Sequence, residues 1–323
     1  MRKTFILIVL LAAPALLFSS QRIGAQETSP GSGLGISPVL SEFNLKPGQA
    51  DKLDINLRNI TGGDIIAEAT INDFVSDNES GNPRIITDPN KKSPNSIRDF
   101  VIGLEGASLA KGEQKKITVT LQAPDKIPPG AYYGIIRFKA VPVSGTSSSQ
   151  PGAVALTASV GTIVLITVPG NLRDQIQLTN LFVYSNKKAG SFFTSKPNQA
   201  GIEVKNLGNG FAQPFGAIEL TGNFNKKIFS YQLNNSTPRS SVLPGSTRIF
   251  KNDLKNINQP GRYTLTANIA YGSGSVLVAK KTFWYIPVWL AVVILLVLLF
   301  LIVATYRLYT GRTGGKRRFK KRR

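Results

Sequence analysis

The sequence predicts an all-β chain of two immunoglobulin-like β-sandwich domains followed by a single C-terminal transmembrane helix. Short apolar alternations separated by Gly, Pro and Asn turns run from about residue 36 to residue 283. Turn sequences of the first half, such as Pro-Gly-x-Tyr, recur in the second half. The stretch 284–305 contains no charged side chain and is almost entirely aliphatic. Together these observations favour two similar domains tethered to a membrane.

The N-terminus has the pattern of a secretory signal peptide. Two basic residues precede an apolar run from Phe5 to Phe18, and a small-residue pair ends at Ala25. We therefore expect a signal peptide over 1–25. Ile23 fits poorly before such a cut, so an uncleaved signal anchor remains the alternative. Residues 26–35 are small and polar, which indicates a flexible lead-in.

The first predicted domain covers 36–169. Leu53–Leu57 and Ile117–Leu121 alternate strictly between apolar and polar residues, so one face of each strand must be buried. The stretches Gly134–Phe138 and Val154–Val168 leave little room for a polar face. We expect these two strands to lie centrally between the sheets.

Two long loops interrupt this domain, Ser76–Asn95 and Val143–Gly152, and both are rich in turn formers. Around the first loop lie oxygen-bearing side chains that could suggest calcium: Asp73, Asp77, Asn78, Glu79 and Asp88. Their spacing does not match an EF-hand loop, so solvated hairpin turns are the better account. Exposed loops at the end of a sandwich are also where a binding surface is built.

The second predicted domain, 174–283, repeats the pattern of the first. Ile202–Asn206 leads into a Gly-rich turn, as Ile55–Asn59 does earlier in the chain. A Pro-Gly-x-Tyr sequence ends at Tyr132 in one half and at Tyr263 in the other. In such sandwiches a Tyr that enters a late strand often hydrogen-bonds back to the preceding corner. Both tyrosines are therefore predicted to be structural rather than ligand-stacking residues.

The apolar stretch 284–305 is predicted to cross a membrane as one helix, because a helix of this length matches the ~30 Å hydrocarbon core. A buried core helix is the alternative. Aromatic residues such as Trp284 and Tyr306 flank the stretch, as at membrane interfaces. Nine basic residues and no acidic residue follow in 306–323. The positive-inside rule places this basic tail in the cytoplasm, in contact with membrane lipids, and the preceding domains outside the cell.

Composition excludes several functions. The formal net charge is +21, but without the tail and the N-terminal basic residues the chain has 27 basic against 18 acidic residues. This excess does not indicate nucleic-acid binding. It could attract an anionic envelope polymer, or it could be an ordinary mixed surface. The chain has no Cys and no His, which removes disulfides, thiol nucleophiles and imidazole bases.

No catalytic, cofactor-binding or metal-binding residue can be nominated, and no specific binding residue either. Walker-type and dinucleotide-binding glycine patterns and the G-x-S-x-G elbow are missing from the sequence. Four carboxylates could in principle converge for glycoside hydrolysis: Glu68, Asp73, Asp99 and Glu105. Eighteen acidic residues on so large a surface make this a weak basis for a site. We therefore predict that the chain is not an enzyme and uses no cofactor.

Three segments of the first half resemble a known family: LKPGQADKLDINLRN at 45–59, LAKGEQKKITVTLQAP at 109–124 and IPPGAYYGIIRF at 127–138. With the order of signal peptide, two β domains, membrane helix and basic tail, the chain resembles the WxL-interacting surface proteins of Gram-positive bacteria. The resemblance implies a first domain that binds peptidoglycan and a second that binds a host or partner protein. The family has no short catalytic motif, so no site residue follows from it.

These observations predict a non-catalytic, membrane-anchored cell-surface binding or adhesion protein. Its exported domains would bind an envelope polymer of the peptidoglycan kind, a partner surface protein, or both. The alternative is a structural scaffold subunit, in which the domains only space or stabilise a membrane-associated surface complex.

Overall fold

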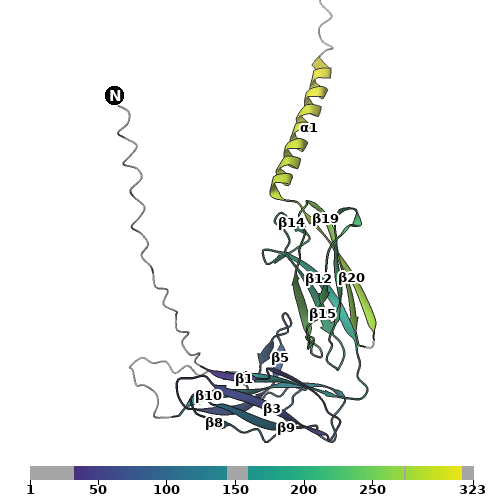
Figure 1. Ribbon diagram of the computed structural model, residues 1–323. Helices are drawn as coiled ribbons and strands as arrows, with labels where there is room; N and C mark the ends of the chain where they lie inside the picture. Colours follow the sequence, from purple (N-terminus) through teal and green to yellow (C-terminus); the bar gives the residue numbers. More distant parts are fainter. Residues whose placement is uncertain (1–32, 144–158, 273, 315–323) are drawn as a thin grey trace, which may run out of the picture.

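The computed structural model describes residues 33–143, 159–272 and 274–314. The predicted signal peptide, most of the lead-in and of the second loop, and the last nine residues of the basic tail lie outside them. Two β-sandwiches meet at an elbow, and the helix α1 (Val288–Gly314) leaves the second sandwich at the end opposite the first (Figure 1). The prediction of a mostly β chain with one C-terminal helix is confirmed.

The first sandwich consists of two packed sheets. In spatial order, the four-stranded sheet holds β1 (Leu34–Ser37), β3 (Ala50–Asn59), β9 (Gln114–Gln122) and β7 (Val101–Ile102). The five-stranded sheet holds β2 (Leu40–Asn44), β11 (Ser159–Val168), β10 (Gly130–Pro142), β4 (Ile65–Asn72) and β8 (Ala107–Leu109). A separate hairpin is formed by β5 (Phe74–Ser76) and β6 (Pro83–Ile85).

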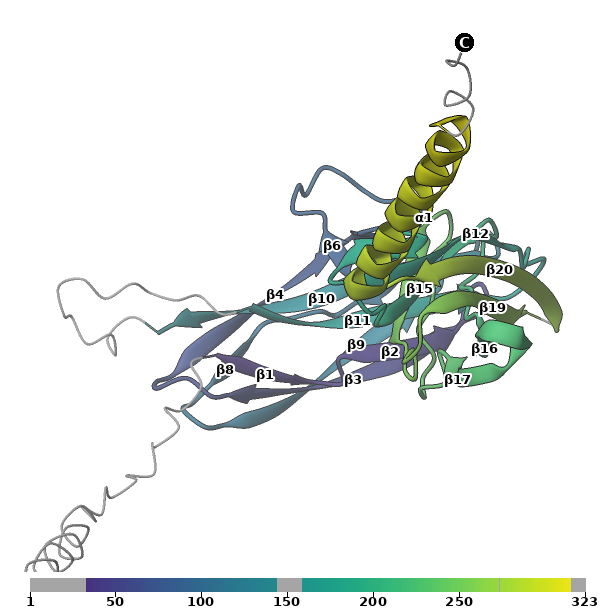
Figure 2. The same cartoon turned by 90° about the horizontal axis from the view of Figure 1, so that it is seen from above.

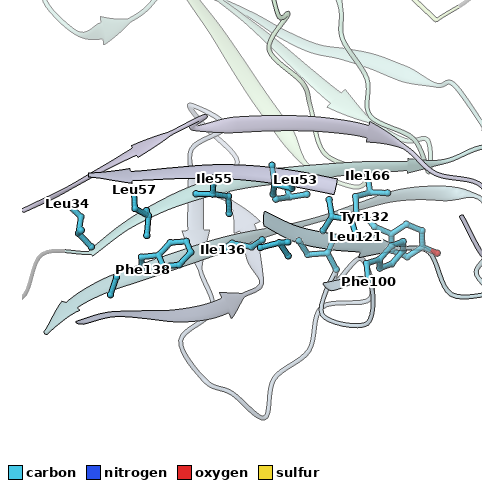
Figure 3. Close-up of a cluster of buried hydrophobic side chains, with 14 of the residues drawn as sticks. Leu34, Leu53, Ile55, Leu57, Phe100, Leu121, Tyr132, Ile136, Phe138 and Ile166 are labelled. Atoms are coloured by element: carbon cyan, nitrogen blue, oxygen red, sulfur yellow. The ribbon is translucent and has the colours of Figure 1, made fainter. Parts of the chain in front are cut away.

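The predicted alternation in the first sandwich is confirmed. In β3 the side chains of Leu53, Ile55 and Leu57 are 3%, 0% and 0% exposed, while their neighbours face away from the core. They pack against residues of the facing sheet, among them Ile136 and Phe138 of β10 (Figure 3). Because the side-chain period of a strand is two, this buried set fixes the register between β3 and its neighbours.

The strands β10 and β11 are buried for a different reason from the predicted one. Alternate residues such as Ile136 and Ile166 face the core between the sheets. The residues between them, including Ile135 and Leu165, belong to a second apolar cluster that also contains Leu243 of the other sandwich. The apolar runs therefore reflect a sheet whose outer face is covered by the second sandwich.

The second sandwich has the same two-layer plan. Its four-stranded sheet holds β13 (Lys188–Ala189), β12 (Ile176–Ser185), β15 (Gln199–Asn206) and β18 (Thr247–Asp253). Its five-stranded sheet holds β14 (Phe192–Phe193), β20 (Ser275–Tyr285), β19 (Gly261–Tyr271), β16 (Phe215–Thr221) and β17 (Lys227–Leu233). A single 3-10 turn, η1 (Asn223–Asn225), lies between β16 and β17.

Asn59 and Asn206 end equivalent strands and make matching hydrogen bonds, as the repeated sequence pattern suggests. In each case the side-chain oxygen accepts the N–H two residues later, and the side-chain NH2 donates to the carbonyl four residues later. The same NH2 also donates to a carbonyl distant in sequence, that of Leu109 or Val242. Both asparagines are fully enclosed, at 0% and 1% exposure.

The two predicted tyrosine corners are confirmed. The Tyr132 hydroxyl donates to the Pro128 carbonyl at 2.9 Å, and the Tyr263 hydroxyl donates to the Gln259 carbonyl. Each bond spans four residues and ties the start of a late strand to the corner before it. Burial raises the pKa of both hydroxyls, which further favours the protonated, donating form.

The helix begins later than the sequence predicts. Trp284 and Tyr285 end β20, where they pair with Arg262 and Gly261 of β19. Only two residues separate the strand from α1, and Pro287 precedes the helix, its carbonyl accepting the first helical N–H groups. The membrane-length part is Val288–Thr310, 23 residues, and at about 1.5 Å per residue it exceeds the ~30 Å hydrocarbon core.

Candidate interaction surfaces

The hairpin β5–β6 connects the first sandwich to the second. The Ile249 N–H donates to the Glu79 carbonyl at 2.6 Å, and the Thr247 N–H donates to Asn78 Oδ1 at 3.2 Å. Both donors lie on the outer edge of β18, the last strand of its sheet. The hairpin tip therefore covers a strand edge that would otherwise be unpaired. The predicted solvated hairpin turn is therefore present in this half of Ser76–Asn95, with residues 77–80 exposed, and its contact with another strand is the part that was not expected.

Charged side chains reinforce the hairpin contact. Lys251 Nζ lies 2.7 Å from Glu79 Oε1, and this hydrogen bond raises the pKa of Lys251. The Asp77 carboxylate instead serves the turn itself. It accepts hydrogen bonds from the Ser80 hydroxyl and from the N–H groups of Glu79 and Gly81, and these bonds, led by that of Ser80, lower its pKa to about 2. Asp77 thus acts as a turn-forming residue.

An apolar cluster fills the elbow between the sandwiches. The Tyr133 ring lies 5.0 Å from the Phe74 ring in its own sandwich and 6.2 Å from the Phe211 ring of the second sandwich. Leu243, 8% exposed, is the buried member that the second sandwich contributes. Such aromatic pairs stabilise by about 0.5–1.5 kcal/mol beyond the burial of their area. We call this set, together with Ile135 and Leu165, the elbow cluster.

Asn209 links the sandwiches a third time. Its carbonyl accepts the Ala131 N–H at 2.8 Å, and its side-chain NH2 donates to the Pro129 carbonyl at 3.2 Å. Two hollows of 240 and 200 Å³ share Phe211 and Gln213 as lining residues. Both are smaller than the roughly 300–1,000 Å³ of a typical small-molecule site.

The C-terminal part of the predicted loop is anchored by the carboxylate of Asp73. This carboxylate is 0% exposed, accepts the Ser93 N–H at 2.9 Å and lies 3.4 Å from Arg98 Nε. Of the other carboxylates considered for glycoside hydrolysis, Asp99 pairs with Lys92 at the surface. Among the described residues no group of three Asp or Glu side chains is placed to hold a metal ion.

The outer edge of β20 is the longest unpaired strand edge of the second sandwich. The N–H groups of Trp284 and Ile286 donate to β14 and its flank, at 2.8 Å each. In a β-strand, successive residues direct their N–H and C=O groups to alternate edges. The even-numbered residues before Trp284 therefore direct these groups to the same outer edge of β20 as Trp284 does. Within the described residues no other strand pairs with this edge between Ser275 and Phe283.

The first sandwich shows what is missing beside Lys280–Phe283. Its equivalent strand, β11, carries β2 along its outer edge in parallel register from Ile163 to Thr167. On β20 only the two residues of β14 occupy the corresponding place. Figure 2 shows β20 at the border of its sheet, next to β19. Val276 and Val278 are 58% and 60% exposed on this strand, so an apolar, unpaired edge is presented to solvent.

The sequence offered only a weak signal for this edge. The run Val276–Ala279 is apolar at every position and Lys280–Thr282 is polar, so the absence of a neighbouring strand cannot be read from it. The sequence also gave no indication that the Asn78–Glu79 turn would contact another domain, because turn composition reports local conformation only.

Comparisons with known proteins add little to this description. No protein-family model and no curated protein matches the chain. Solved structures with some likeness include a chaperone–tip adhesin complex of CFA/I fimbriae, at 14% identity and TM-score 0.39 over 77% of this chain and 98% of that chain. Another is the CsuC–CsuE complex of Acinetobacter baumannii, at 13% identity and TM-score 0.36 over 77% and 98%. At these scores the likeness carries no argument about function.

Proposed function

We propose that the chain is a non-catalytic, membrane-anchored cell-surface protein that binds a partner protein through the open edge of β20. The observation that carries this proposal is the unpaired, apolar edge at Val276–Lys280. An exposed strand edge is a template for pairing with an extended segment of another chain. The partner segment would add one strand beside β20 and supply acidic residues opposite Lys280 and Lys281.

The helix α1 supports anchoring and orientation. Its side chains from Val288 to Thr310 are not covered by the rest of the described chain, so a bilayer is the environment that suits them. The basic residues after the helix favour a cytoplasmic C-terminus and exported sandwiches. On this account both domains are immunoglobulin-like modules held outside the cell.

The scaffold alternative has one observation in its favour. Three separate contact sets join the sandwiches at the elbow, and this rigidity would suit a spacer in a larger complex. Binding of an envelope polymer by the first domain remains a prediction from the family resemblance. Within the loop Ser76–Asn95 that was expected to serve such a polymer, Asn78 and Glu79 contact β18 instead.

A photo-crosslinking residue at Val276, in the full chain in its host membrane, tests partner binding. We expect a covalent adduct with one surface protein. On this background Val278→Pro should reduce the adduct at least tenfold, because it removes an edge N–H without breaking the ladder to β19. Val278→Thr keeps that N–H and should leave the adduct unchanged.

A crosslinker at Glu219, in the middle of the same sheet, provides the control and should not give this adduct. If Val278→Pro leaves the Val276 adduct as strong as in the parent chain, strand addition at β20 is refuted. The scaffold account would then be preferred.

A further inference from the structure

The end of the second sandwich nearest α1 has an unusual surface. Three segments form it: 186–198, 222–227 and 254–262, which connect strands at the end where β20 leads into the helix (Figure 1). Together they contain seven exposed basic residues and no acidic residue: Lys187, Lys188, Lys196, Lys226, Lys227, Lys255 and Arg262. We call this set of segments the basal surface.

Phe224 projects from the basal surface. Its side chain is 103% exposed, more than in an extended reference chain, and its backbone adopts φ 60°, ψ 28°. Left-handed backbone of this kind is costly for a bulky residue and persists only where the surroundings hold it. Asn223 does so, since it donates to the Pro260 carbonyl and accepts the Arg262 N–H. The molecule therefore presents an aromatic ring to solvent at a conformational cost.

A second aromatic ring lies on the same surface. Phe192 is 75% exposed, and its strand pairs with β20 at Trp284, four residues before α1 begins. Phe224 itself borders an open hollow of 410 Å³, which is also lined by Lys226, Lys227, Asn256 and Asn258. Exposed rings flanked by lysines and amide groups match the chemistry of a lipid interface, where rings enter the headgroup layer and cations meet phosphates.

We propose that the basal surface docks on the outer leaflet of the membrane, with Phe224 and Phe192 in the headgroup layer and the basic residues on anionic lipid phosphates. This inference rests on the proposed membrane anchoring by α1. Only Ile286 and Pro287 separate β20 from the helix, so the basal surface is held close to the bilayer. Docking would fix the orientation of the second sandwich on the membrane and, through the elbow, that of the first sandwich.

A nitroxide label tests the docking in the full chain, reconstituted in phosphatidylglycerol vesicles, because the chain has no native Cys. The reporter is Asn225→Cys, which leaves Phe224 in place. Matched labels are Leu299→Cys in the middle of α1 and Asn235→Cys at the elbow end of the same sandwich. We expect the Asn225 label to be accessible to dissolved oxygen and protected from a water-soluble nickel complex, as the Leu299 label is. The Asn235 label should show the reverse.

Phe224→Gly provides the sharpest variant. Glycine relieves the left-handed backbone at this position, so the fold should be at least as stable. The Asn225 label should nevertheless lose its protection, because the anchoring ring is gone. A triple variant, Lys188→Gln, Lys226→Gln and Lys255→Gln, should lower the ratio of docked to free protein by about fivefold for each lysine replaced. Vesicles of phosphatidylcholine, which carry no net charge, should remove the attraction of all the basic residues together.

The outcomes separate the two claims. If the Asn225 label is exposed to water while the Leu299 label lies in the lipid, the docking proposal is overturned and the membrane anchor stands. A Leu299 label in water refutes the membrane anchor, and the docking with it. Protection that persists in Phe224→Gly would also overturn the proposal, since the ring would not be what holds the surface to the lipid.

Discussion

Replacing Asn206 with alanine is expected to lower the free energy of unfolding by about 2–4 kcal/mol, because buried polar groups left without partners cost about 1–3 kcal/mol each. Asn206 satisfies three backbone groups inside the second sandwich: the N–H of Gly208 and the carbonyls of Gly210 and Val242. At 1% exposure water cannot replace the side chain. Denaturant unfolding of the purified protein measures the change.

Two further variants make this prediction specific. Asn206→Asp retains the acceptor for Gly208 but turns a carboxylate toward two carbonyls, so it should destabilise at least as much as alanine. Asn235→Ala removes an exposed asparagine of the same sandwich and should stay within about 0.5 kcal/mol of the parent. An Asn206→Ala protein as stable as the parent would show that the matched network does not carry the fold.

Phe211→Asp should loosen the junction between the two sandwiches. Phe211 contributes its partly buried ring to the elbow cluster opposite Tyr133, and full burial of such a side chain would be worth about 1.5–3 kcal/mol. A carboxylate there would also face an apolar surface without a partner. The remaining hairpin contacts include the Lys251–Glu79 pair, which is partly exposed, and such pairs contribute at most about 1 kcal/mol. The hydrogen bonds of Asn78, Glu79 and Asn209 would remain, at about 0.5–1.5 kcal/mol each, so the orientation of the two sandwiches should become variable without full separation.

Distances between nitroxide labels at Lys115→Cys in the first sandwich and Ser230→Cys in the second measure this coupling. The parent chain should give one narrow distance distribution and the Phe211→Asp chain a broad one. Ile102→Asp, which alters a half-exposed apolar residue outside the elbow cluster, is the control and should keep the distribution narrow. A broad distribution in the parent would contradict a rigid elbow.

Local patterns predicted the parts of the fold that depend on local physics. The alternation at Leu53–Leu57 identified a strand with one buried face, and the Pro-Gly-x-Tyr sequences identified the corners at Tyr132 and Tyr263. Asn59 and Asn206 could be matched because their turns demand the same residue types. Each of these features is determined by side-chain period or turn geometry, which a single sequence records.

Contacts between distant parts could not be predicted in this way. Ser76–Asn95 reads as a loop because its turn formers outnumber its apolar residues, yet Pro83–Ile85 pairs with β5 and the tip covers β18. Trp284 and Tyr285 read as the start of the helix because aromatic residues suit both an interface and a strand end. Phe224 attracts no notice in the sequence, since only the structure shows that its ring is exposed and its backbone left-handed.

Membrane topology tests the central claim, an exported two-sandwich protein on a C-terminal anchor, most directly. Two single-cysteine chains would be expressed, Ser236→Cys in the second sandwich and a cysteine appended after Arg323. Intact cells stripped of their wall would then be treated with a maleimide that cannot cross membranes. The account predicts labelling of the Ser236 position at once, and of the appended cysteine only after the membrane is permeabilised. Labelling of the appended cysteine in intact cells, with the Ser236 position protected, would contradict it.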